Sequence, residues 1–355
     1  MGNIFFTPGP SQLYPTVKKH LLYALRENIP SISHRGQRFQ EIYEGTVSGL
    51  RQLLNIPDSH RVYFLTSGTE AMERCVENCV EKESFHLVNG SFSKRFYNTA
   101  LELRKKSQIH EVAPGAGFAL SDITISKHTE LICVTQNETS TGVQVPMSDV
   151  YRLKKQYPDK LIALDIVSSA PYVNVDFKKV DLVFFSVQKG FGLASGLAVI
   201  IVSPDAFAKA KRLNEKGKSI GSYHSFLSLE QYALKNQTPE TPNVLGIYLL
   251  GKIIEDMKRM NIKILRMETE EKARLLYKYF DKHPKYKSFV KEKKLRSQTV
   301  IVAEIDEGSK PLIEKLKKKG LVVGSGYGEF KERQIRIANF PAISMRNIKE
   351  LLSSI

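Results

Sequence analysis

The sequence predicts an α/β protein with a mostly parallel, seven-stranded sheet covered by helices, followed by a small α+β domain. Three observations support this. Between about residues 60 and 205, short apolar runs alternate with helix-length amphipathic runs, as in parallel sheets with helical crossovers. After about residue 245, two long helix-like segments precede two short strands. The 355 residues, 42% of them hydrophobic, suffice for two cores.

The first part of the chain supplies the larger sheet. A helix is expected at residues 37–54, where helical periodicity stops just before Pro57. Long connections separate the first five expected strands, whereas a short glycine-rich link joins the last two and could make the final strand antiparallel. The seven expected strands are residues 61–66, 85–89, 109–113, 131–136, 161–165, 182–187 and 197–202.

The second part has a different character. Residues 244–260 and 263–283 predict two long helices, and residues 299–304 and 333–338 predict two short strands. A helix is expected between these strands at residues 310–319, and another at the C-terminus. We therefore assign residues 15–245 to a large domain, and residues 1–14 with 246–355 to a small one.

Composition excludes several classes of protein. No apolar run approaches the ~20 residues that cross a bilayer, and the N-terminus lacks the basic and apolar regions of a secretory signal. Three cysteines cannot form a disulfide framework, which favours the reducing cytoplasm. Cys75 and Cys79 lie four apart on an expected helix with no further ligands nearby, so we expect buried thiols and no metal.

The net charge of +16 invites a nucleic-acid interpretation. However, the densest lysine clusters, at residues 282–294 and 310–319, contain glutamates and fit solvated helix-like faces. No basic stripe interleaved with aromatics is visible. We expect neither a nucleic acid nor a membrane as partner, and the positive field would modestly steer anionic substrates.

One lysine carries the strongest chemical signal. Lys189 follows an apolar strand-like run and enters a glycine-rich turn, and Asp165 ends another apolar run 24 residues earlier. A lysine can hold the aldehyde of pyridoxal phosphate as a Schiff base, and an aspartate can pair with the pyridine nitrogen. The two residues together form the skeleton of a pyridoxal phosphate site.

A phosphate-binding turn is expected after the first strand. Ser67, Gly68 and Thr69 open a helix and offer hydroxyls, backbone N–H groups and the positive end of the helix dipole. The alternative is an ordinary N-cap made by Ser67 or Thr69. The later lysine and aspartate favour the phosphate interpretation.

Other polar or aromatic groups also follow strands at the same expected edge of the sheet, where α/β proteins bind ligands. Phe92 could stack on a planar ring or belong to the core, and Val167 would point the same way as Asp165 and could pack on a ring face. Gln188 could reach a phosphate or phenolic oxygen, and residues 136–142 add a polar run.

These residues resemble the class V aminotransferases of pyridoxal phosphate fold type I over nearly the whole chain. The resemblance implies that Lys189 forms the Schiff base, Asp165 pairs with the pyridinium, and Gly68 and Thr69 bind the phosphate. Phe92 occupies the position of the stacking aromatic, usually tryptophan. The resemblance further assigns the hydroxyl contact with the ring oxygen to Thr139.

The same resemblance implies a homodimer with a shared site. Residues 237–241 resemble an Asn-Thr-Pro-Pro-Thr segment that reaches the cofactor phosphate of the partner subunit, here with Gln237 and Thr238. Residues 33–36 resemble a Ser-His-Arg segment whose members bind the substrate's phosphate or distal acid. These would be His34 and Arg35, and the alternative is that both only cap and pair locally.

Two further positions complete the implied site. Arg336 matches the arginine that holds the substrate α-carboxylate, although a surface salt bridge is the alternative. Residues 6–10, with Gly9, resemble the opening segment that lines the site.

Within the class, the chain most resembles the phosphoserine aminotransferases of serine biosynthesis, which exchange an amino group between glutamate and 3-phosphohydroxypyruvate. Two features depart from them: Thr69 stands where an arginine is frequent, and residues 6–10 look more like alanine–glyoxylate or serine–pyruvate aminotransferases. The latter are the alternative. A cysteine desulfurase would need a late cysteine, and none follows Cys133. Residues 114–117 lack the third glycine of a dinucleotide fingerprint.

Overall fold

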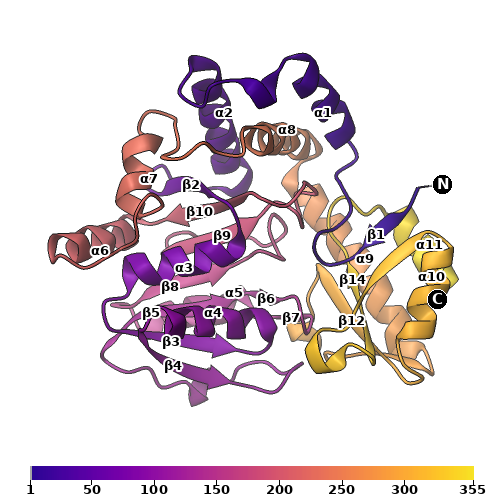
Figure 1. Ribbon diagram of the computed structural model, residues 1–355. Coiled ribbons are helices and arrows are strands. Elements are labelled where there is room, and N and C mark those ends of the chain that lie inside the picture. The colour runs from indigo at the N-terminus through magenta and orange to yellow at the C-terminus, as the bar shows by residue number, and fades with distance from the viewer. Residues whose placement is uncertain (1) are drawn as a thin grey trace.

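The computed structural model describes residues 2–355 and confirms the predicted fold class (Figure 1). The larger sheet has seven strands in the order β2-β10-β9-β8-β5-β3-β4. Neighbours from β9 to β4 are parallel, and β10 is antiparallel to both β9 and β2, as the short link before it allowed. The strands are β2 (Arg61–Leu65), β3 (Glu83–Val88), β4 (Lys106–Glu111), β5 (Thr129–Thr135), β8 (Leu161–Asp165), β9 (Leu182–Ser186) and β10 (Ala198–Val202).

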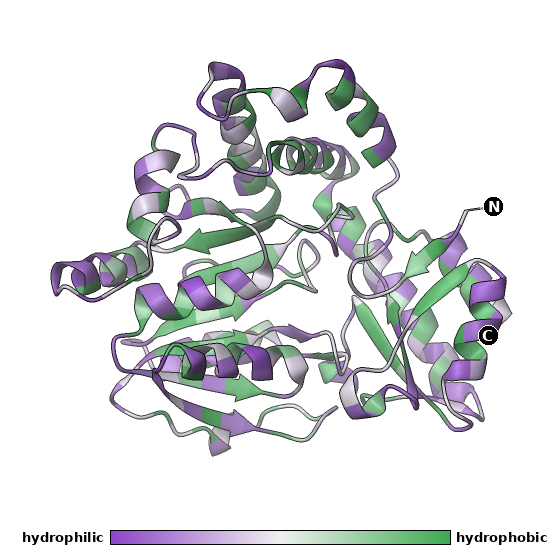
Figure 2. Ribbon diagram, viewed as in Figure 1, coloured by the Kyte–Doolittle hydropathy of each residue, from purple (hydrophilic) through white to green (hydrophobic). Residues whose placement is uncertain are grey.

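Helices cover this sheet on both faces, so most of its strands are apolar on both sides (Figure 2). In β2, Val62 and Phe64 belong to one core, whereas Tyr63 and Leu65 belong to the core on the opposite face. This arrangement explains the nearly continuous apolar runs of the sequence. The covering helices are α2 (Gln37–Leu54), α5 (Met147–Gln156) and α8 (Val244–Met260) on the first face, and α3 (Gly68–Cys79), α4 (Ser91–Glu102), α6 (Pro204–Glu215) and α7 (Phe226–Ala233) on the second.

A second sheet has five strands in the order β1-β13-β14-β12-β11. The N-terminal strand β1 pairs in parallel with β13, so the two ends of the chain meet in this sheet (Figure 1). Its core also takes side chains from three helices. The elements are β1 (Ile4–Phe6), α9 (Ile262–Lys282), β11 (Tyr286–Ser288), β12 (Val300–Ile305), α10 (Lys310–Lys318), β13 (Leu321–Ser325), β14 (Gln334–Ala338) and α11 (Met345–Ser354).

The expected helices at 37–54 and 244–260 coincide with α2 and α8. Helix α8 was assigned to the small domain, but it packs against α1 (Val17–Arg26) and α2, and its apolar face lies in a core of the larger sheet. Strands β1, β11 and β13 were not expected; β1 and β11 span only three residues each, too few to show a periodicity. No helix among the described residues is long and apolar enough to cross a membrane.

Candidate active site

The site lies at one edge of the larger sheet. Strands β3, β5, β8 and β9 are mutually parallel, and antiparallel β10 places β2 in the same direction as β9. All five therefore end at the edge where α/β sheets bind ligands. Asp165 is the last residue of β8, and the segments that leave the other four strands contain the phosphate turn, Phe92, Thr139 and Lys189.

Lys189 is only 6% exposed, and its amine is surrounded by predicted site residues. Nζ donates a hydrogen bond to Thr139 Oγ1 at 2.9 Å and lies 5.1 Å from the centroid of the Phe92 ring. Gly9 packs on the lysine side chain so closely that a Cβ there would lie 2.8 Å from Lys189 Cε. Burial lowers the pKa of Lys189, and Asp165 partly opposes this shift. A buried amine with a lowered pKa is suited to attack a carbonyl carbon.

Asp165 ends β8 and is 3% exposed. Burial raises the pKa of its carboxyl, while the Val167 N–H, which donates to Oδ1 at 2.8 Å, and the charge of Lys189 act in the opposite direction. Asp165 and Lys189 thus place one acid and one base in a site with little solvent, which is a common property of catalytic centres.

The predicted phosphate turn opens α3. Ser67 caps this helix by accepting from the Glu70 N–H at 3.1 Å, so the capping alternative is correct for Ser67. The N–H groups of Gly68 and Thr69 have no acceptor within residues 2–355. A Cβ at Gly68 would lie 2.8 Å from Val167 Cγ2. The turn is therefore capped and still presents free N–H groups at the positive end of a helix.

Strand β14 of the second sheet brings Arg336 next to Thr139. Arg336 Nε donates to the Ser325 carbonyl at 2.7 Å, and Nη1 lies 3.4 Å from the Thr139 carbonyl. Its guanidinium carbon lies 5.2 Å from the centroid of the Tyr327 ring, which in turn is 5.6 Å from the Phe92 ring. The predicted carboxylate-binding arginine thus reaches the site from a strand of the second sheet.

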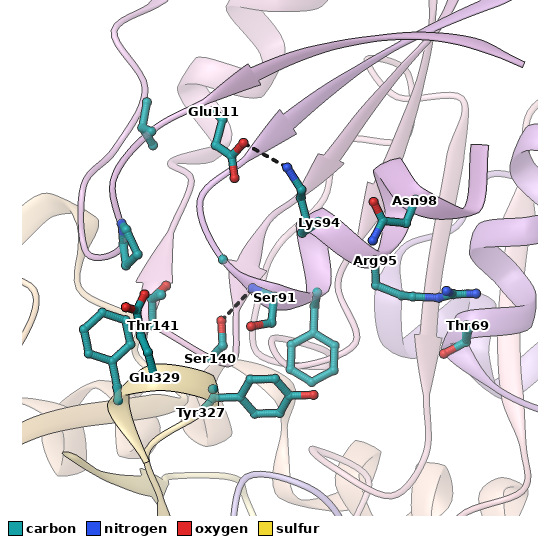
Figure 3. A pocket seen from close by; sticks show the side chains of 16 residues that line it. Thr69, Ser91, Lys94, Arg95, Asn98, Glu111, Ser140, Thr141, Tyr327 and Glu329 are labelled. Carbon is teal, nitrogen blue, oxygen red and sulfur yellow. Dashed lines mark hydrogen bonds and ion pairs between the residues drawn. The ribbon is translucent and has the colours of Figure 1, made fainter. Parts of the chain in front are cut away.

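An open cleft of about 680 Å³ lies beside this cluster, between the start of α4 and the small domain (Figure 3). The Tyr327 ring points into it from the small domain, and Ser91 donates its N–H to Ser140 Oγ at 3.0 Å on the opposite wall. The cleft gives a ligand access to the neighbourhood of Phe92. Other residues that line it are Thr69, Lys94, Arg95, Thr141, Glu329 and Phe330.

Gln188 lies beside the lysine, with Nε2 3.3 Å from Ser186 Oγ and Oε1 buried without a partner among the residues that the structure describes. A buried, unsatisfied amide oxygen is costly, and the side chain can present either end to a ligand. Its predicted contact with a phosphate or phenolic oxygen stays a prediction.

Arg35 is placed differently from the residues above. Its guanidinium donates to Gln237 Oε1 at 3.0 Å, to the Thr238 carbonyl at 2.6 Å and to the Pro239 carbonyl at 3.0 Å. Arg35 thus holds the segment predicted to reach the partner subunit. No hydrogen bond joins His34 or Arg35 to Lys189 within residues 2–355, and their substrate role stays a prediction.

The sequence reasoning missed several charged residues around the site. Glu138 is fully buried and accepts hydrogen bonds from the start of α4. His224 is 1% exposed and joins Glu70, in the first turn of α3, to Glu240, in the segment that Arg35 holds. Tyr327 was also overlooked. Only Glu138 had a visible signal, its place in the polar run after β5.

Comparisons with known proteins indicate one family. The family model of class-V aminotransferases matches residues 4–329. A phosphoserine aminotransferase of Rhodococcus opacus is 26% identical over 354 residues, covering 99% of this chain and 93% of that protein.

Solved structures extend the likeness. A phosphoserine aminotransferase of Cytophaga hutchinsonii is 47% identical, with a TM-score of 0.97, and the alignment covers 99% of this chain and 98% of that one. An alanine–glyoxylate aminotransferase of Nostoc shares the fold with a TM-score of 0.81 at 21% identity, over 100% of this chain and 94% of its own.

Proposed function

Because this chain belongs to the class-V aminotransferase family, we propose that it is a pyridoxal phosphate-dependent transaminase that exchanges an amino group between glutamate and 3-phosphohydroxypyruvate. The observation that carries the proposal is the buried Lys189 amine beside Thr139 and Phe92, on a fold that matches a phosphoserine aminotransferase at 47% identity over 99% of the chain.

The residues present fit the cofactor. Pyridoxal phosphate, when bound, supplies an aldehyde that condenses with amines and a ring that accepts electrons from the substrate Cα. The Lys189 amine would hold the aldehyde, and the free N–H groups at the start of α3 would hold the phosphate. The other contacts we assign are Asp165 to the ring nitrogen, Phe92 and Val167 to the ring faces, Thr139 to the ring oxygen, and Gln188 with Ser67 to the phosphate.

The protein's own groups account for the proton transfers. With the cofactor and substrate bound, Lys189 Nζ would act as the base that removes the proton from the substrate Cα. In the same half-reaction it would act as the acid that gives the proton up again, which completes a 1,3-proton shift. Burial, which lowers the pKa of Lys189, favours the neutral amine that this role requires. Asp165 Oδ1 receives the Val167 N–H, which fixes the carboxylate. The neighbouring strands exclude water from this pair, which strengthens their electrostatic interaction.

Arg336 is positioned to grip the substrate α-carboxylate. Its Nε is fixed on the Ser325 carbonyl and its Nη1 makes a long bond to the Thr139 carbonyl. The second Nη1 hydrogen and both Nη2 hydrogens stay available for a two-pronged hydrogen bond. His34 and Arg35 would bind the second anion of the substrate, which is the phosphate of phosphoserine or the side-chain carboxylate of glutamate. One site for substrates with two anionic groups would then serve both half-reactions.

We further propose a homodimer in which Gln237 and Thr238 reach the partner's cofactor phosphate. In this chain, Arg35 and the Glu240–His224 contact hold the segment in a defined shape, which supports such a role. We also propose a cytoplasmic location, since the three cysteines are free and buried.

The test is a substrate panel with a lysine variant. Purified enzyme with pyridoxal phosphate should transaminate 3-phosphohydroxypyruvate with glutamate faster than glyoxylate with alanine. Lys189→Ala should lose the cofactor's visible absorbance and lower turnover by at least roughly 10²–10⁴-fold. Lys154→Ala is the matched control, because that lysine pairs with Asp181 at 2.9 Å near the opposite edge of the sheet. Retained activity in Lys189→Ala would refute the catalytic assignment, and faster glyoxylate turnover would refute the substrate.

A further inference from the structure

The carboxylate of Glu138 is fully buried between the start of α4 and Ser140, and both of its oxygens are in use. Oε2 accepts from the backbone N–H groups of Phe92 and Ser93 at 3.1 and 2.9 Å, and from Ser93 Oγ at 2.9 Å. Oε1 accepts from Ser140 N–H at 3.0 Å and Ser140 Oγ at 2.7 Å. Hydrogen bonds to an ionised acceptor are about twice as strong as neutral ones.

The backbone of the turn is shaped for this carboxylate. A Cβ at Gly90 would lie 2.4 Å from Glu138 Cγ and 2.5 Å from Ser140 Oγ, so only glycine admits the glutamate at this distance. The carboxylate also lies at the positive end of α4, where a negative charge stabilises a helix. The glycine at position 90 leaves space for the Glu138 side chain, and the N-terminus of α4 stabilises its negative charge.

Two groups that face the lysine depend on this contact. The Phe92 ring lies 5.1 Å from Lys189 Nζ, and the backbone N–H of Phe92 donates to the Glu138 carboxylate. Thr139, the next residue in the chain, accepts from Lys189 Nζ at 2.9 Å, and its carbonyl faces Arg336 at 3.4 Å. A displacement of Glu138 would move both the aromatic wall and the hydroxyl.

Glu138 also sets the charge of the site. The charged groups around the Lys189 amine are Asp165, Glu138 and Arg336. The Glu138 carboxylate, like that of Asp165, favours the ammonium form of the lysine, and the Arg336 guanidinium opposes it.

We propose that Glu138 is a positioning residue of the reacting end of the site: it fixes the Phe92 ring and the Thr139 hydroxyl relative to Lys189, and its charge offsets those of Lys189 and Arg336. This inference rests on the proposed function, because its consequences are measured on the bound cofactor.

Glu138→Gln is the first test. A glutamine cannot accept on both sides, so its amide N–H must face the backbone N–H of Ser140 or those of Phe92 and Ser93. We expect the circular dichroism of the bound cofactor, which reports ring orientation, to weaken, and kcat to fall roughly 10²-fold. The rate of cofactor association with cofactor-free protein should rise with pH as the lysine becomes neutral. The midpoint of this rise should move to lower pH in Glu138→Gln, because the carboxylate that favours the ammonium form is gone.

Glu130→Gln is the matched control. At the opposite end of β5, Glu130 Oε2 accepts from the Lys82 and Glu83 N–H groups at 2.7 and 3.2 Å, and Oε1 pairs with Lys209. A glutamine here also cannot accept on both sides, so the same loss occurs far from the site. This variant should keep the wild-type dichroism and pH midpoint.

Ser140→Ala keeps the charge but removes the 2.7 Å bond, and decides the question if Glu138→Gln does not fold. Its dichroism should weaken without a shift of the midpoint. The positioning role is wrong if Glu138→Gln and Ser140→Ala both show the wild-type dichroism. If only Ser140→Ala folds, its wild-type dichroism alone overturns this role. An unmoved midpoint in Glu138→Gln overturns the role of the charge. A wild-type protein that binds no cofactor would instead defeat the proposed function.

Discussion

Raising the pH from 7 to 10 should loosen the segment at residues 237–241 from the first turn of α3, through the titration of His224. The ring of this buried histidine contacts Glu70 through Nδ1 and Glu240 through Nε2, the latter at 2.9 Å. Burial alone would lower the pKa of His224, but hydrogen bonds to the two carboxylates outweigh burial and raise the pKa to about 9. The folded protein therefore binds this proton more tightly than the unfolded chain does.

The sign and size of the effect follow from linkage. A group whose pKa rises on folding stabilises the protein fully below its unfolded pKa of 6.5, and the contribution disappears as the pH passes the folded value of about 9. With about 1.4 kcal/mol for each pKa unit, the protonated histidine contributes about 2.5 kcal/mol at pH 7 and almost nothing at pH 10.

The assay is urea unfolding of wild type and His224→Gln at pH 7 and pH 10, followed by far-ultraviolet circular dichroism. The difference in unfolding free energy between the two proteins should be about 2.5 kcal/mol larger at pH 7 than at pH 10, because other titrating groups cancel in the comparison. His128→Gln, at an exposed histidine, is the control and should follow wild type. A difference of equal size at both pH values would refute the reasoning.

Three further variants probe the site directly. Asp165→Asn should keep the covalent link to Lys189 but lower turnover by roughly 10²-fold or more, measured in single-turnover experiments. Arg336→Lys should raise KM for the amino acid roughly tenfold with a smaller change in kcat, because a lysine cannot form the two-pronged contact. Gly68→Ala should weaken cofactor binding in equilibrium titrations, since the new methyl would lie 2.8 Å from Val167 Cγ2; adding Val167→Ala should restore part of it.

The larger sheet could be predicted from the sequence because most of its strands are apolar on both faces and amphipathic helices separate many of them. The runs at 161–165 and 182–187 correspond to β8 and β9 almost residue for residue. The second sheet was harder to predict, because β1 pairs with β13 across more than three hundred residues and spans only three residues itself. No local pattern encodes a pairing that the rest of the fold must first bring together.

The site residues that were missed likewise depend on contacts between distant parts of the chain, whereas those that were predicted do not. Lys189 and Asp165 stand at the ends of apolar strands, and parallel strands bring their ends to one edge, so their meeting follows from periodicity alone. The function of Glu138 depends instead on a turn about 46 residues earlier, and that of His224 on a helix start 154 residues away. A glutamate in a polar run has the same local sequence whether it faces water or caps a buried helix. Only the packing of α4 against the end of β5 turns this carboxylate into a determinant of where Phe92 and Thr139 lie.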